Sequence, residues 1–64
     1  MNNQLTAIIS KDDLGYFVSL RDGSKLICFI QATSTDVRYW STLQAAKSYL
    51  RTRALYKNYS IVTA

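Results

Sequence analysis

Hydrophobic and polar residues alternate at the start of the chain. Residues 4–10 follow the period of two that is typical of a β-strand, because Leu5, Ala7 and Ile9 are separated by Thr6, Ile8 and Ser10. The segment KDDLG (11–15) has the composition of a turn. Residues 16–32 contain two further apolar runs separated by Asp22 and Gly23, and Asp-Gly is a preferred two-residue hairpin loop. The pattern therefore predicts three consecutive antiparallel strands.

An Asp22-Gly23 loop also predicts how the second and third strands pair. It places Leu20 opposite Lys25, and Val18 opposite Ile27. We expect the face with Val18, Leu20, Ile27 and Phe29 to meet a helix, although the same pattern also allows the two faces to be exchanged. The other face is too apolar to be left in water, and it predicts a dimer or protein interface formed by Phe17, Leu26, Cys28 and Ile30.

After residue 40 the apolar residues recur at the spacing of a helix. Residues 33–36 (TSTD) are expected to form a loop, and residues 37–40 (VRYW) a short extended entry. Ser41 followed by Gln44 is a capping-box pattern, which predicts a helix that begins at Thr42. The helix has an apolar stripe at steps of three and four residues, made of Leu43, Ala46, Leu50 and Ala54. Residues 59–63 (YSIVT) are expected to form a last strand.

These elements predict one α+β domain over residues 1–64, with residues 1–3 disordered. Its expected architecture is a three- to four-stranded antiparallel sheet packed on one helix, in the order β-β-β-α-β.

Charge is distributed unevenly along the chain. All four acidic residues lie within residues 1–36, whereas residues 37–64 hold five basic residues and no acid. An acid-free basic half favours an anionic partner such as nucleic acid or an acidic protein surface. We expect this partner to contact six residues in the second half of the chain, namely Arg38, Lys47, Arg51, Arg53, Tyr56 and Lys57.

The residues needed for catalysis are scarce. The chain has neither histidine nor glutamate, and its two glycines belong to separate turns rather than to a phosphate-binding loop. A serine or cysteine nucleophile would lack a base to activate it. We expect no enzymatic activity, no metal site and no cofactor. With no apolar stretch that could cross a membrane, we expect a cytoplasmic protein.

Residues 14–52 resemble the small arm-type DNA-binding domains of tyrosine recombinases. The resemblance rests on the three strands and on the step Trp40-Ser41-Thr42 into a helix that contains Ala45-Ala46-Lys47. In that family the open face of the sheet enters the DNA major groove. In size and charge the chain is also similar to small phage and plasmid proteins, among them anti-CRISPR proteins that bind host nucleoprotein complexes.

Three hypotheses follow from the sequence. The first is a non-catalytic nucleic-acid-binding module of mobile-element type, with DNA favoured, which contacts phosphates through the basic face of its helix. The second is a phage- or plasmid-borne inhibitor or adaptor that binds a host protein or nucleoprotein complex. The third is a purely structural subunit. We expect a homodimer, or an obligate partner, that uses one sheet face or an edge strand such as residues 59–63.

Overall fold

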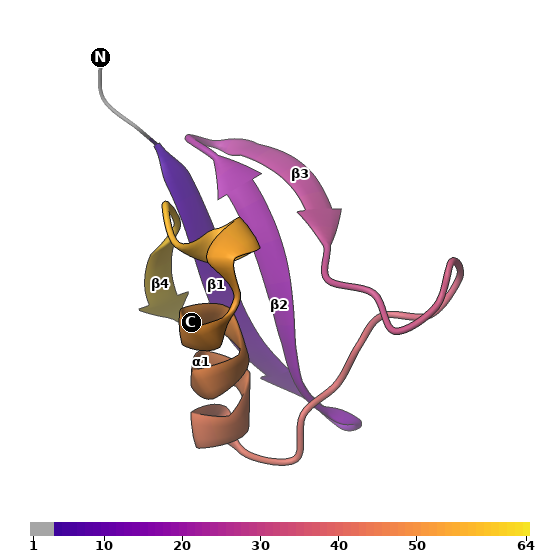
Figure 1. Cartoon of the computed structure of the whole chain (residues 1–64). Coiled ribbons are helices and arrows are strands. Elements are labelled where there is room, and N and C mark those ends of the chain that lie inside the picture. The colour runs from indigo at the N-terminus through magenta and orange to yellow at the C-terminus, as the bar shows by residue number, and fades with distance from the viewer. Residues whose placement is uncertain (1–3) are drawn as a thin grey trace.

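The computed structural model describes residues 4–64, which form four strands, one α-helix and one short 3₁₀ helix (Figure 1). The predicted disorder of residues 1–3 lies outside the described residues. The element order confirms the predicted β-β-β-α-β architecture. In chain order the elements are β1 (Leu5–Asp12), β2 (Gly15–Asp22), β3 (Lys25–Phe29), α1 (Leu43–Thr52), η1 (Ala54–Tyr56) and β4 (Ser60–Thr63).

The four strands form one sheet in the order β3-β2-β1-β4. The pairs β1–β2 and β2–β3 are antiparallel, as predicted, whereas β4 pairs parallel with β1. The sheet is therefore mixed rather than wholly antiparallel. Parallel neighbours need a long crossover connection, and here the route from β3 through α1 and η1 brings the chain back in the direction of β1. Figure 1 shows α1 lying across the face formed by β1 and β2.

The hairpin between β2 and β3 differs from the predicted register. Asp22 pairs with Lys25, so the two loop residues are Gly23 and Ser24 instead of Asp22 and Gly23. Gly23 has a φ of 64°. Glycine at the first loop position is what a type II′ turn requires. A type I′ turn at Asp22-Gly23 would instead have forced a positive φ on Asp22.

A bulge between Leu20 and Arg21 shifts the register again, so that Leu20 lies opposite Cys28 and Ser19 opposite Phe29. Side chains alternate between the two faces of a strand, so these shifts change which residues of β3 meet the helix. Cys28 lies on the face that α1 covers, and Phe29 lies on the open face. The expectation that Phe29 packs under the helix is therefore wrong.

Ile30 also moves to the helix-covered side. Its backbone N–H donates to the carbonyl of Val18 (3.1 Å), and its side chain is only 4% exposed. The prediction that Ile30 belongs to a surface interface is wrong, because the bulge places Ile30 in the core beside Val18.

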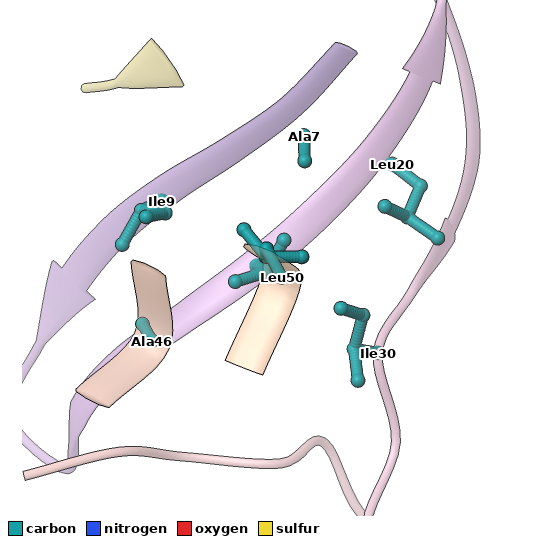
Figure 2. Packing of buried hydrophobic residues seen from close by; sticks show 7 residues of the cluster. Ala7, Ile9, Leu20, Ile30, Ala46 and Leu50 are labelled. Atoms are coloured by element: carbon teal, nitrogen blue, oxygen red, sulfur yellow. The ribbon is translucent and has the colours of Figure 1, made fainter. Parts of the chain in front are cut away.

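The core lies between α1 and the sheet (Figure 2). Leu50 is 1% exposed and projects over β2, with Ala46 and Ile9 on one side and Leu20 and Ile30 on the other. This arrangement confirms Ala46 and Leu50 as the centre of the apolar stripe. The buried apolar residues are Ala7, Ile9, Val18, Leu20, Ile30, Ala46 and Leu50.

The helix begins one residue later than predicted. The N-cap is Thr42, whose Oγ1 accepts a hydrogen bond from the backbone N–H of Ala45 (3.1 Å). Ser41 precedes the cap. A threonine at this position satisfies one of the backbone donors left free in the first turn of the helix.

The segment that leads into the helix is held at two points. Tyr16 and Trp40 exchange two backbone hydrogen bonds of 2.9 and 2.8 Å, and the N–H of Arg38 donates to the carbonyl of Ile30 (2.9 Å). Gly15 permits this close approach, because a Cβ at that position would lie 2.7 Å from the carbonyl oxygen of Trp40. Arg38 and Trp40 are therefore set at fixed positions relative to the core.

Candidate functional site

Four aromatic side chains form a continuous row beside the helix. The ring of Trp40 lies 5.1 Å from that of Tyr49, Tyr49 lies 6.1 Å from Tyr56, and Tyr56 lies 6.0 Å from Tyr59, measured between ring centroids. All four are half-buried and pack against the core. Each ring therefore has one part fixed by the interior and another part at the surface. We call Trp40, Tyr49, Tyr56 and Tyr59 the aromatic row.

Two guanidinium groups contact this row. Cζ of Arg38 lies 5.1 Å from the centre of the Tyr49 ring and 5.4 Å from that of Trp40. Cζ of Arg53 lies 4.7 Å from the centre of the Tyr49 ring. These distances are those of cation–π interactions. Tyr49 thus has two positive charges beside a single ring.

Arg38 is the more constrained of these two cations. Its Nε is buried and has no hydrogen-bond partner among residues 4–64. Leaving such a donor unpaired costs roughly 1–3 kcal/mol. No salt bridge to a carboxylate is present for Arg38 among residues 4–64. The fold therefore keeps a cation here at some cost to its own stability.

The structure divides the six predicted contact residues between two surfaces. Lys47 and Arg51 are each two residues from Tyr49, which places them about 200° away around the helix axis. Arg53 follows Tyr49 by four residues and lies on the same flank, as its ring contact shows. The predicted basic helix face is therefore not one surface.

Arg38, Arg53 and Tyr56 gather at the aromatic row, whereas Lys47 and Arg51 lie on the opposite flank of α1. Lys57 is exposed and directly follows Tyr56. The sequence prediction did not include Trp40, Tyr49 and Tyr59 among the six contact residues, although the structure places them beside Tyr56. The spacing of four between Tyr49 and Arg53, and of two between Arg38 and Trp40, could have indicated them, because both spacings bring side chains to one side of a helix or an extended segment.

Burial raises the pKa of Tyr56 above the ordinary tyrosine value of 10.0. Tyr49, Cys28 and Tyr59 raise it further, and Arg53 opposes them. Tyr56 is therefore a neutral phenol at physiological pH. The predicted place of Cys28 in an interface on the open sheet face is wrong, because the hairpin register puts it on the helix side.

The face of the sheet opposite α1 carries its own aromatic group. The ring centroid of Phe17 lies 6.0 Å from that of Phe29 and 5.8 Å from that of Tyr39. The hydroxyl of Tyr39 donates to Oδ2 of Asp12 (2.9 Å), and this bond raises the pKa of Tyr39.

Three apolar residues adjoin this group, and the sheet register places them on the same face: Ile8, Leu26 and Val62. Leu26, Phe29 and Val62 are 42%, 37% and 44% exposed. Of the predicted interface residues, Phe17 and Leu26 lie here. We call Ile8, Phe17, Leu26, Phe29, Tyr39 and Val62 the open sheet face.

The structure offers few other places for a ligand. Within residues 4–64, no three His, Cys, Asp or Glu side chains come together to hold a metal ion, and no enclosed pocket is present. None of the helices in this part of the chain has the length and apolar character needed to cross a membrane. Comparisons with protein-family models, curated proteins and solved structures found no match to this chain.

Proposed function

We propose that this protein is a non-catalytic nucleic-acid-binding module that holds its ligand with Arg38, Arg53 and the aromatic row. The observation that carries the proposal is the pair of arginines stacked beside Tyr49, one of them with a buried and unpaired Nε. Such an arrangement costs stability in the free protein, and an anionic ligand would offset that cost.

A guanidinium group that is held against an aromatic ring is already oriented to bind phosphate. The five N–H donors of arginine lie in the plane of the group, so a ring against its flat face restricts its motion and still leaves donors free at its edge. Arg38 and Arg53 both lie over the Tyr49 ring, with Cζ 5.1 and 4.7 Å from its centre. Phosphate contacts of this kind position a nucleic acid without reading its sequence. We therefore expect binding with weak sequence preference.

The test is a titration with labelled DNA at about 50 and about 200 mM salt. The logarithm of the affinity should fall linearly with the logarithm of the salt concentration. Each lost phosphate contact lowers that slope by about 0.9 on duplex and about 0.7 on single strands. Arg53→Gln should lower both the slope and the affinity. Arg51→Gln is the matched control, because it removes the same charge from the opposite flank of α1.

Two results would contradict the proposal. One is the absence of binding at either salt concentration. The other is an equal loss of affinity in Arg51→Gln and Arg53→Gln, which would indicate a general charge effect and no localised site. Circular dichroism of each variant checks that the fold is retained.

A second function, self-association, is favoured by the open sheet face. Its six named side chains are apolar or aromatic, as in an interface core, and the register places the polar residues Ser19 and Arg21 beside them on the same face. The strands span 4–8 residues. Two faces of this size would bury on the order of 1,000 Å², near the lower limit for a specific interface. We propose that a second copy of the chain covers this face and forms a symmetric dimer of modest affinity.

Analytical ultracentrifugation over a range of concentrations tests the dimer. The wild-type protein should dimerise, and Phe29→Asp should be a monomer. Leu14→Asp is the control, because Leu14 is also an exposed apolar residue, 74% exposed, but lies in the turn between β1 and β2. A wild-type monomer at every concentration would overturn self-association. If a host protein were then captured by the wild type and not by Phe29→Asp, the inhibitor or adaptor hypothesis, of anti-CRISPR type, would replace it.

A further inference from the structure

The rings of the aromatic row are tilted relative to one another. The interplanar angles are 56° between Trp40 and Tyr49, 39° between Tyr49 and Tyr56, and 69° between Tyr56 and Tyr59. Bases inside a duplex are parallel and already stacked on their neighbours, so they cannot follow planes that turn in this way. The bases of a single strand rotate independently, and each can stack on a ring of different orientation.

The shape of the site also disfavours a duplex. A protein that reads duplex DNA inserts a helix or a β-ribbon into a groove. Here α1 is packed onto the sheet through Ala46 and Leu50, and Tyr49 lies on the flank of that helix. The row is completed by residues before and after α1, so it forms a surface strip beside the helix. Such a strip can reach the flat faces of bases only where those bases are unpaired.

Cations accompany the rings along the row. Arg38 lies by Trp40 and Tyr49, Arg53 by Tyr49, and Lys57 directly follows Tyr56 in the chain. Alternation of stacking rings with phosphate-binding cations is the arrangement by which single strands are held without sequence preference. Three rings, with the two arginines over Tyr49 between them, correspond to a site of about four nucleotides, at the small end of the range for single-strand-binding domains.

We infer, on the basis of the proposed nucleic-acid binding, that the ligand is single-stranded nucleic acid whose bases stack on Trp40, Tyr56 and Tyr59, while Tyr49 carries the two arginines. Arg38 and Arg53 hold the phosphates on either side of Tyr49. The aromatic row does not itself distinguish DNA from RNA, because stacking uses the base and not the sugar.

The experiment uses the fluorescence of Trp40, which is the single tryptophan of the chain. The full-length protein is titrated with a mixed-sequence DNA strand of about 12 nucleotides, with the same strand as RNA, and with the DNA duplex. Each single strand should quench Trp40 and bind at least about tenfold more tightly than the duplex, since two or more stacked bases together contribute this much or more.

Substitutions in the aromatic row test whether a base stacks on Tyr56. Tyr56→Leu should weaken single-strand binding by about 5- to 150-fold, the range for loss of one stacked base, whereas Tyr56→Phe keeps the ring and should stay within about twofold of the wild type. Tyr39→Leu is the control, because Tyr39 packs against Phe17 on the opposite face of the sheet.

The two proposals fail in different ways. Duplex binding as tight as single-strand binding would overturn the inference and leave the proposed function standing. Binding to neither form would end both. The comparison of single strand with duplex needs only the wild-type protein, so it decides the matter even if Tyr56→Leu does not fold.

Discussion

The guanidinium of Arg53, the C-cap residue that follows α1 in an extended conformation, lies 4.7 Å from the centre of the Tyr49 ring on the flank of that helix. This contact separates Arg53 from Arg51, which carries the same charge on the other flank. The two residues look equivalent in the sequence, yet only Arg53 belongs to the aromatic surface. The predictions below use such pairs, in which one member has the structural contact and the other does not.

Replacing Arg38 with Met should separate stability from binding. Methionine keeps an apolar stem against Trp40 and Tyr49 but removes the buried and unpaired Nε. We expect the free energy of unfolding to stay unchanged or to rise by about 1 kcal/mol, while nucleic-acid binding weakens. Urea denaturation and DNA titration measure the two effects. A large loss of stability would instead give Arg38 a structural role.

Replacing Leu50 with Ala should destabilise the protein by about 2–5 kcal/mol, because Leu50 is 1% exposed and fills the space between α1 and the sheet. The matched control is Leu55→Ala. Leu55 is 76% exposed, and its truncation should change stability by less than about 0.5 kcal/mol. Thermal denaturation compares the variants, and equal midpoints would show that Leu50 is not central to the core.

The helix cap can be identified by comparing neighbouring residues. Thr42→Ala removes the acceptor for the N–H of Ala45 and should cost about 0.5–2 kcal/mol. Ser41→Ala should cost less than about 0.5 kcal/mol, because Ser41 precedes the cap and is exposed. Chemical denaturation of both variants provides the measurement. The opposite order would mean that the helix begins at Thr42, as the sequence pattern indicated.

Stability should fall in alkaline solution. The pKa values of Tyr56 and Tyr39 are raised in the folded protein, the first mainly by burial and the second mainly by its hydrogen bond to Asp12. The folded state therefore holds these protons more tightly than the unfolded chain does. Their contribution is complete below a pH of about 10 and is lost as pH rises through the folded pKa values.

Denaturation measured at several values between about pH 8 and 11 should show this decline. A variant with both Tyr39→Phe and Tyr56→Phe should show a weaker one. Identical profiles for the wild type and the variant would mean that other groups cause the loss.

The local pattern of residues determined much of the secondary structure. The alternation in residues 4–10 predicts β1, and the spacing of Ala46 and Leu50 predicts the buried face of α1, because each depends only on the period of one element. The excess of basic residues in residues 37–64 is likewise a property of the sequence alone. The order of the elements along the chain was also predicted correctly, because it follows from reading each local pattern in turn.

Contacts between elements decided the rest. Asp22-Gly23 and Gly23-Ser24 are both acceptable loops for a short hairpin, and only the pairing of β3 along β2, with its bulge, sends Ile30 into the core and Phe29 to the open face. The parallel pairing of β4 with β1 depends on the crossover through α1. The aromatic row likewise joins residues from four segments of the chain. A one-residue change in register reverses which face a side chain occupies, so these features were set by packing between elements and could not follow from the period of any single one.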